Sequence, residues 1–180
     1  MADEEFERFR DYLHVLAESQ LNARLRRKID AADVVQQTLM QAYQAREQFR
    51  GTTDAELAAW LRTILCNVLF GLAREYSRQC RDVTREQSMH ALEQSSMHLA
   101  NLLAANTSTP SAALQRHERA NEIAHAMLKL TSEQRQAIML KYWHEATLAE
   151  IAEQLGKSTE AVACLIFRGM QKLRGTFKES

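Results

Sequence analysis

Apolar side chains recur every three or four positions along much of this 180-residue chain, the spacing that places them on one face of a helix. Two such series stand out in the first half of the chain: Val34, Val35, Leu39, Ala42 and Tyr43, and then Leu57, Trp60, Leu61, Ile64, Leu65 and Val68. Residues 49–54 between them predict a turn, with Thr53 or Asp54 capping the second helix. An earlier helix is expected over about residues 4–25, and Asp30 begins the next one.

The last third of the chain shows the same period in four segments. We expect helices over about residues 114–130, 132–144, 148–155 and 159–174. Thr131 and Gln134 have the spacing of a capping box, in which each side chain bonds the backbone N–H of the other residue. This pair indicates where the second of the four helices begins.

Between the two helical blocks, residues 82–109 change character and are rich in serine, glutamine, histidine, asparagine and threonine. The stretch ends in a polar cluster before Pro110, which suits the start of a new helix. We interpret it as a flexible linker with a helical part around residues 89–103. The pattern therefore predicts an all-α protein with two small helical domains, residues 1–81 and 111–180, joined by a linker over residues 82–110.

The most specific pattern covers residues 147–165 and is typical of a helix-turn-helix, two short helices packed steeply across a tight turn. Ala152 allows the two helices to approach closely, and Gly156 suits the left-handed backbone of the turn. The four interface positions are apolar: Ile151, Leu155, Val162 and Leu165. Ser158 or Thr159 caps the second helix, whose first residues then point into a DNA major groove. The alternative is a helical hairpin that binds no DNA.

Composition agrees with an all-helical chain. Five glycines and one proline accompany 46% hydrophobic and 26% charged residues, which excludes collagen-like, low-complexity and wholly disordered classes. Three of the first five residues are acidic and no apolar run approaches the roughly 18 residues of a membrane span, so we expect a cytoplasmic protein with no membrane span. Cys66, Cys80 and Cys164 show no paired zinc-ligand spacing, and we expect neither a metal nor a cofactor.

The formal net charge is zero, whereas a protein that binds DNA unaided usually carries a clear positive excess. The basic residues are nevertheless concentrated in two places. Residues 157–178 contain Lys157, Arg168, Lys172, Arg174 and Lys178 against one acid, Glu160, and residues 62–81 contain Arg62, Arg74, Arg78 and Arg81 against Glu75. Two modest basic faces on a neutral chain suit a protein that contacts DNA with the help of a large partner.

These blocks resemble the extracytoplasmic-function sigma factors, compact sigma factors with two conserved domains. Residues 131–174 are similar to sigma region 4. Residues 33–43 resemble the region 2 helix that docks on the clamp of RNA polymerase, and residues 60–67 the segment that opens and reads the −10 promoter element. The resemblance implies a non-enzymatic factor that guides core RNA polymerase to promoter DNA, with an anti-sigma protein as a further partner.

The resemblance and the helical pattern assign three sets of site residues. Polymerase binding is expected at Asp33, Gln36 and Gln37. The −10 element is expected at Trp60, Arg62, Asn67, Arg74 and Arg78, and the −35 element at Lys157, Ser158, Thr159, Glu160, Ala163, Phe167, Arg168 and Lys172. Trp60 has a second interpretation as a core residue, which its apolar neighbours favour.

Three departures from the family pattern bear on these sites. The family usually has an acid where Gln37 stands and often aspartate where Gly71 stands. Small or apolar residues, Ala163, Cys164 and Leu165, replace the family's basic or hydroxyl residues in the recognition helix, so fewer hydrogen bonds to base edges are available. Either the −35 element is read through DNA shape, or Arg168 carries most of the readout.

Two other functions fit parts of the pattern. A sigma-like adaptor or decoy would bind polymerase without initiating, and a stand-alone helix-turn-helix regulator would bind operator DNA as a dimer. An enzyme fits less well, because no nucleophile elbow, P-loop or His-Glu-x-x-His occurs. Glu122 and His125 have the Glu-x-x-His spacing of di-iron bundles, but such sites need this motif twice.

Overall fold

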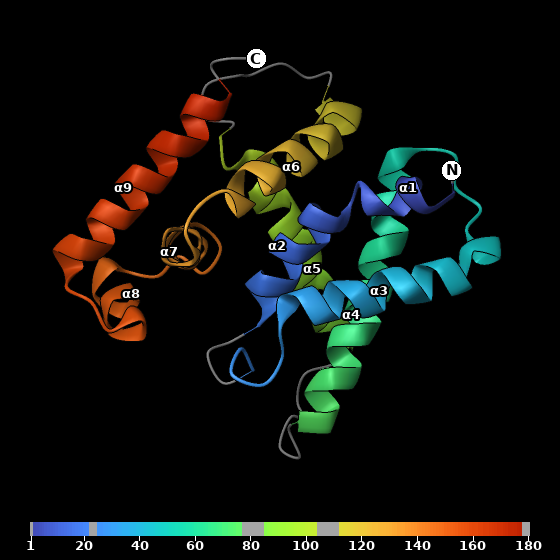
Figure 1. The fold of residues 1–180 in the computed structure, drawn as a ribbon, viewed down its shortest axis with the longest axis horizontal. Helices are drawn as coiled ribbons and strands as arrows, with labels where there is room; N and C mark the ends of the chain where they lie inside the picture. Colours follow the sequence, from blue (N-terminus) through green and yellow to red (C-terminus); the bar gives the residue numbers. More distant parts are fainter. Residues whose placement is uncertain (1, 22–24, 77–84, 104–111, 178–180) are drawn as a thin grey trace.

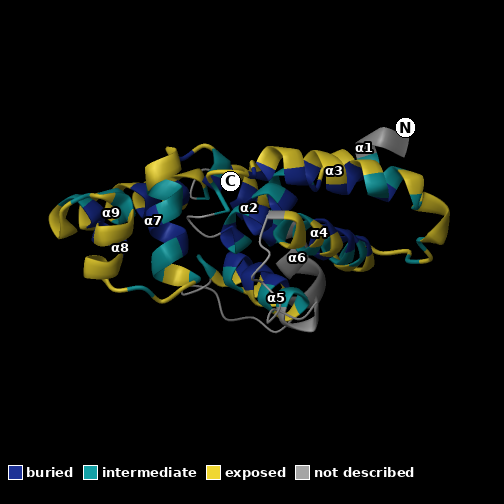
Figure 2. Cartoon of the chain, turned by 90° about the horizontal axis from the view of Figure 1, so that it is seen from below, coloured by how far each residue is buried: buried dark blue, intermediate teal, exposed yellow. Residues whose placement is uncertain are grey.

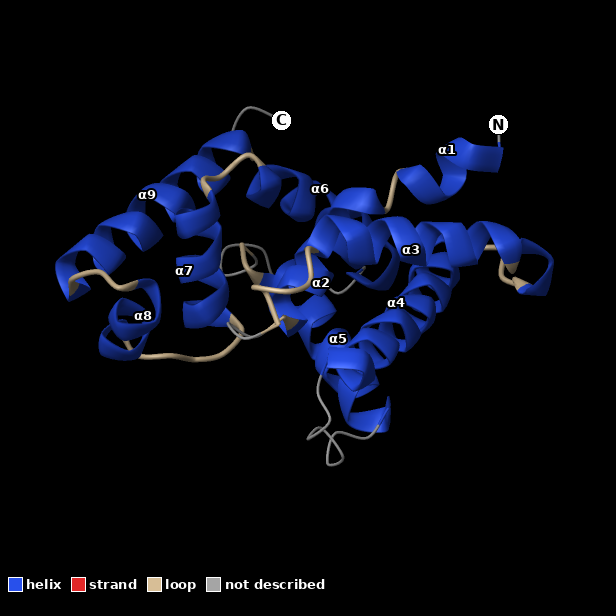
Figure 3. Ribbon diagram, turned by 60° about the horizontal axis from the view of Figure 1, so that its bottom comes forward, coloured by secondary structure: helices blue, strands red, loops and turns tan. Residues whose placement is uncertain are grey.

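The computed structural model describes residues 2–21, 25–76, 85–103 and 112–177. Within these ranges the chain forms nine α-helices and one short 3-10 helix, with no strand (Figure 3). The helices are α1 (Ala2–Glu7), α2 (Arg10–Gln20), α3 (Ala31–Gln44), η1 (Arg46–Gln48), α4 (Asp54–Tyr76), α5 (Arg85–Asn101), α6 (Ala112–Leu128), α7 (Ser132–Tyr142), α8 (Leu148–Leu155) and α9 (Thr159–Thr176). The prediction of an all-α fold is confirmed.

The single helix predicted over residues 4–25 is wrong, because the chain divides there into α1 and α2. Between them, the N–H of Phe9 donates to the carbonyl of Phe6 at 3.0 Å, a tighter turn than that of an α-helix. Both phenylalanine side chains are 1% exposed, so this turn accompanies the burial of two aromatic rings three residues apart. The helix α2 ends at Gln20 because the buried Leu21 adopts an extended backbone.

Side-chain caps set the start of five helices. A polar side chain accepts a hydrogen bond from an N–H of the first turn in each case: Asp30 for α3, Thr53 for α4, Thr131 for α7, Thr147 for α8 and Ser158 for α9. The capping box predicted at Thr131 is confirmed, and Thr147 forms a second one with Glu150. Of the alternatives left open by the sequence, Thr53 and Ser158 are the capping residues.

Helix α2 is at the centre of the main core, where it packs against α3, α4, α5 and α6 (Figure 1). Helix α4 is long and apolar enough to cross a membrane by length and composition alone, the one such helix among the described residues. Its Leu57, Leu61 and Leu65 are at most 1% exposed and belong to this core, in which α4 packs against α3. The apolar character of α4 is therefore explained by packing inside the protein.

The segment expected to be a flexible linker contains α5, which packs on α2 and α4. Leu92 and Leu99 are fully buried, and the small Ser95 and Ser96 between them are buried as well. Two leucines seven residues apart lie on one helix face, but the serines between them hide the apolar period in the sequence. The helical part expected over residues 89–103 is thus present and docked, whereas Pro110 lies outside the described residues.

Helix α6 packs on α2 and α5 rather than mainly on the helices that follow it. Ile123, Ala124 and Met127 are buried in the main core. We therefore call α1–α6 the N-terminal body, although the sequence placed α6 in the second domain. Helices α7, α8 and α9 lie at one side of the molecule and are here called the C-terminal module (Figure 1). Ile138 and Met139 of α7 and Met170 and Leu173 of α9 join this module to the main core.

We expect Gly169→Val to destabilise the C-terminal module by about 1–3 kcal/mol through overpacking. A Cβ atom at Gly169 would lie 2.7 Å from Ile138 Cδ1 and 3.4 Å from Gln134 Cβ, so either the buried Ile138 side chain would have to shift or α7 and α9 would have to move apart. Gly175→Val on the same helix is the control, because nothing lies within 4 Å of a Cβ atom there. Urea denaturation measures both variants, and equal stabilities would contradict the close approach of α7 and α9.

Candidate nucleic-acid interface

The turn between α8 and α9 has the backbone of a helix-turn-helix. Gly156 adopts the left-handed conformation, with φ 62° and ψ 40°. The N–H of Lys157 then donates to the carbonyl of Ala152 at 2.9 Å, and the N–H of Gly156 to that of Glu153 at 3.3 Å. These bonds satisfy the last carbonyls of α8 and redirect the chain, as the glycine predicted.

Apolar packing fixes the angle between the two helices. Ile151 and Val162 are fully buried, and Ala152 is buried at the centre of the contact. Leu155 and Leu165 are partly buried against the same cluster, which also includes Ala137 of α7. The four predicted interface positions therefore pack as expected, and α7 supports the pair from behind.

The outer face of α9 carries the residues expected to meet −35 bases. Glu160, Ala163 and Phe167 lie at helical spacing on this face and are exposed, with Phe167 70% exposed. Cys164 and Arg168 are exposed beside them. The exposed side chains on this face are thus mostly small or apolar. The exceptions are the carboxylate of Glu160 near the N-terminus of the helix and the guanidinium of Arg168 further along.

The hydroxyl and carboxyl groups at the start of α9 are already engaged in local bonds. Ser158 Oγ accepts from the N–H of Ala161 at 3.2 Å as the helix cap. Hydrogen bonds from its own N–H and from the hydroxyls of Ser158 and Thr159 lower the pKa of Glu160. Glu160 is consequently a carboxylate at neutral pH. It can accept a hydrogen bond from the amino group of a base, whereas it would repel a DNA phosphate.

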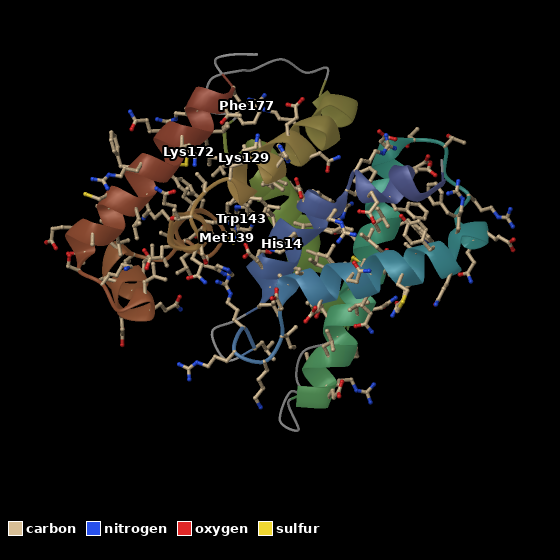
Figure 4. All side chains as sticks on the ribbon, viewed as in Figure 1. His14, Lys129, Met139, Trp143, Lys172 and Phe177 are labelled. Atoms are coloured by element: carbon tan, nitrogen blue, oxygen red, sulfur yellow. The ribbon has the colours of Figure 1, made fainter. Side chains whose placement is uncertain are left out.

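The basic residues of the helix-turn-helix, expected at phosphates or, for Arg168, at bases, divide into two kinds. Lys157 Nζ lies 2.7 Å from Glu133 Oε1. Lys172 Nζ donates to the carbonyl of Lys129 at 2.8 Å, and Figure 4 labels these two residues. Arg168 and Arg174 are exposed on α9. In this structure, both lysines hold parts of the protein together, and a phosphate would have to compete with those contacts.

The residues expected at the −10 element lie on different faces of α4. Asn67 and Arg74 are exposed and seven residues apart, so they share one face, with the exposed Gly71 between them. The Arg74 guanidinium lies 5.9 Å from the centre of the Phe70 ring. Arg78 lies outside the described residues.

Trp60 and Arg62 are turned towards the protein interior. The Trp60 ring centre lies 5.9 Å from that of Phe6 and 5.3 Å from that of Phe49, which favours the core interpretation of this residue. Arg62 donates to the Tyr12 hydroxyl at 2.8 Å, and its Nε is buried with no hydrogen-bond partner. The Arg62 guanidinium is directed at α2, so a phosphate would have to compete with the Tyr12 hydroxyl for it.

Helix α3 presents a polar stripe to solvent. Figure 2 shows α3 exposed along one side and buried along the other. Asp33, Gln36 and Gln37 are exposed, whereas Val34, Val35 and Leu39 are buried. The Gln36 side chain accepts from Arg10 at 3.5 Å. Met40 is 53% exposed on the same stripe and was missed as a candidate, although its spacing of three and four residues from the two glutamines was a visible signal.

The described residues contain no group of three histidine, cysteine or acidic side chains arranged to hold a metal ion. His125, half of the Glu-x-x-His pattern, instead lies with Nδ1 2.6 Å from Asp11 Oδ2 on α2. This histidine therefore links α6 to α2 within the N-terminal body.

Two family models match the chain in the order of its two helical blocks. The model described as sigma-70 region 2 matches residues 6–79, which contain α2, α3 and the whole of α4. The model described as sigma-70, region 4, matches residues 126–175, which contain α7, α8 and nearly all of α9. Helix α5 lies between the two matches.

Proposed function

This chain belongs to the sigma-70 family, as a two-domain, extracytoplasmic-function type of sigma factor, and we propose that it binds core RNA polymerase, recognises the −10 and −35 elements of specific promoters and starts transcription. The observation that carries this proposal is the helix-turn-helix of α8 and α9 in the same chain as an exposed polar stripe on α3. The role requires no catalysed reaction. It places the protein in the cytoplasm with polymerase and promoter DNA, and an anti-sigma protein is a further partner that the family implies.

Polymerase docking is proposed for the α3 stripe. Asp33, Gln36 and Gln37 supply the polar contacts, and Met40 adds an apolar one at the same face. A polar rim around a partly apolar centre is the usual composition of a protein–protein interface. Because Gln37 is neutral, Asp33 would provide the charge complementarity to a basic surface of the polymerase clamp.

Recognition of the −10 element is proposed for the exposed face of α4. Asn67 can both donate to and accept from a base, and Arg74 and Arg78 would bind the phosphates of the displaced strand. Opening the duplex needs only capture of an unstacked base, which offsets an unstacking cost of a few kcal/mol. Trp60 would support this face from the core side.

Recognition of the −35 element is proposed for the outer face of α9. Arg168 would supply most hydrogen bonds to base edges, since Ala163 and Cys164 offer few. Glu160 would accept from a cytosine amino group, and Phe167 would contact apolar parts of the bases. The N–H groups at the start of α9, at Ser158 and Thr159, would bind the DNA backbone. Lys157 and Lys172 would bind DNA phosphates after releasing Glu133 and the Lys129 carbonyl, their present partners.

The test is transcription with purified core polymerase, mapped genome-wide, for the wild type and for a variant with Asp33→Arg and Gln36→Arg. Initiation from a defined promoter set is expected for the wild type. The variant should bind core at least about 30-fold more weakly, the loss that a hot spot of 2 kcal/mol implies, because it places two like charges against a basic clamp.

The matched control carries Glu93→Arg and Gln94→Arg, two exposed positions of α5 with the same change in charge. This control should initiate from the same promoters as the wild type. Polymerase binding without initiation would favour an adaptor, and tight binding to free duplex without polymerase would favour a stand-alone regulator; either result would contradict the proposal.

A further inference from the structure

A continuous stripe of exposed side chains runs along the outer side of α9, which lies at the edge of the molecule (Figure 1). Glu160, Ala163 and Phe167 follow one another at spacings of three and four residues, and Cys164 is exposed beside Ala163. The buried Val162 lies on the opposite face, towards α8. The proposed function places this stripe at the −35 element, so the chemistry of its side chains decides which bases the protein selects.

The middle of the stripe has almost no group that donates a hydrogen bond to a base edge. Ala163 and Phe167 carry no polar side-chain atom, and the thiol of Cys164 is a weak donor. The common polar contacts of the major groove, arginine or lysine to guanine and asparagine or glutamine to adenine, therefore have no side chain here. The groups that an apolar surface does contact in this groove are the 5-methyl groups of thymine, which pack against alanine and phenylalanine.

Phe167 is placed to make such a contact. Its ring is 70% exposed and stands beside a hollow of about 390 Å³, so apolar groups of a partner can enter next to the ring. The exposed Arg168 follows it directly, and the exposed Arg174 lies two turns further along the same face. An apolar ring between two cations matches a partner that has apolar groups between its phosphates. Thymine-containing DNA has both.

The acid at the start of the stripe selects a base by the donor that the base shows. Hydrogen bonds from its own N–H and from the hydroxyls of Ser158 and Thr159 keep the pKa of Glu160 low, so its side chain only accepts. In the major groove, the amino groups of cytosine and adenine are the donors. Adenine places the acceptor N7 beside its amino group, and guanine and thymine show acceptors there. A carboxylate therefore favours cytosine.

Helix geometry places these contacts on successive base pairs. At 1.5 Å per residue, Glu160 and Phe167 are about 10.5 Å apart along α9, which equals about three base-pair steps of 3.4 Å. Ala163 lies between them, and Arg168 comes one residue after Phe167. A helix that lies along the major groove thus meets about four base pairs with a carboxylate, two apolar contacts and a guanidinium, in that order.

Two nearby cations are engaged within the protein, which increases the weight of the base contacts. Lys157 Nζ lies 2.7 Å from Glu133 Oε1, and Lys172 Nζ donates to the carbonyl of Lys129 at 2.8 Å. Phosphate contacts supply much of the affinity of most DNA-binding proteins. With these two lysines engaged, the loss of a single base contact has a measurable effect on binding.

We propose that α9 reads the −35 element through the 5-methyl groups of its pyrimidines. Ala163 and Phe167 contact the methyl groups of two thymines, Glu160 accepts from the amino group of a cytosine at one end, and Arg168 binds a guanine at the other. This inference rests on the proposed function and adds to it the class of sequence that is read.

Deoxyuridine tests the proposal, because it pairs as thymidine does and lacks only the 5-methyl group. Holoenzyme made from the full chain and core polymerase is bound to a promoter found by the genome-wide mapping, with deoxyuridine in place of each −35 thymidine in turn. Loss of one contacted methyl group should weaken binding about fourfold, and loss of two about 15-fold, as burial of groups of this size implies. Deoxyuridine in the spacer between the two elements is the control and should have no effect.

A second substitution in the DNA separates the methyl group from the base pair that carries it. Cytosine in place of a contacted thymine should weaken binding, and 5-methylcytosine at the same position should restore part of the loss, because it supplies the same methyl group. No difference between cytosine and 5-methylcytosine would contradict recognition through the methyl group.

Phe167→Ala connects the methyl effect to one side chain. The variant should bind the thymidine promoter about as weakly as the wild type binds the singly substituted deoxyuridine promoter, and it should no longer distinguish the two at that position. Because the ring is exposed, the fold is retained, which circular dichroism verifies. Met97→Ala is the matched control, since it truncates another exposed apolar side chain, 60% exposed on α5, and should keep the fourfold discrimination.

Glu160→Gln tests the cytosine contact. Glutamine binds adenine through N6 and N7, so the preferred base at this position should change from cytosine to adenine. Glu153→Gln, the same change of charge at an exposed position of α8, should leave the preference at cytosine.

Equal binding of the thymidine and deoxyuridine promoters by the wild-type holoenzyme would overturn the inference and leave the proposed function standing. A set of mapped −35 elements without thymine would overturn it in the same way. Failure of the wild-type chain to direct core polymerase to any promoter would instead contradict the proposed function.

Discussion

Replacing Val162 with aspartate is expected to unfold the C-terminal module and to reduce initiation at promoters that need the −35 element by at least about 100-fold. Val162 is fully buried between α8 and α9 in the cluster with Ala137, Ile151 and Ala152. Loss of its apolar burial costs about 1.5–3 kcal/mol, and an unpaired carboxylate in the same place costs several more. A three-helix module this small has little stability to spare, so the combined cost exceeds what it has.

Hydrogen exchange resolved along the chain is the measurement for this variant. Amide protection should be lost in α8 and α9 and retained in α2, α3 and α4, because α1–α6 supply most of the main core, to which Val162 does not belong. Ala149→Asp is the control, since it introduces the same charge at an exposed position in the first turn of α8, where an acid is tolerated. Protection of α9 in the Val162→Asp variant would mean that the cluster does not hold the module together.

The parts of the fold that depend on neighbouring residues were predictable from the sequence. Gly156 predicted the turn through its left-handed backbone, and Ala152 predicted the close helix contact through its small side chain. The caps at Thr131 and Ser158 were predictable for the same reason, since a cap bonds an N–H within three residues. The exposed stripe of α3 followed from helical spacing alone.

The parts that depend on distant residues were not predictable. Glu18 and Arg135 are 117 positions apart, and neither has a local signal that names its partner. Arg62 was expected at a phosphate because it is basic, but α2 supplies the Tyr12 hydroxyl to it. The docking of α5 depends on Ser95 and Ser96, which pack against α2. In the sequence, these serines resemble the composition of a linker. The roles of the individual site residues in binding DNA and polymerase stay predictions.

Glu18→Gln is expected to lower the free energy of unfolding at pH 7 by about 3 kcal/mol and to remove much of the acid sensitivity of the protein. Burial raises the pKa of Glu18, but His14, 3.7 Å away, and the bidentate Arg135 outweigh it and lower the pKa from 4.5 to about 2. A shift of this size corresponds to about 3 kcal/mol at 1.36 kcal/mol per unit. The amide cannot reproduce the charge and leaves Arg135 largely buried without a counter-ion.

The direction of the pH dependence follows from the lowered pKa. A carboxyl group with a lower pKa in the folded state stabilises it fully above the unfolded value of 4.5, and this contribution disappears as the pH falls towards about 2. Urea denaturation at pH 7, 4.5 and 3 should therefore show wild type and Glu18→Gln converging as the pH falls. Glu93→Gln, an exposed change on α5, should follow the wild type throughout. A constant difference between wild type and Glu18→Gln over this range would mean that the variant loses packing rather than the ion pair, and that Glu18 does not hold the module through its charge.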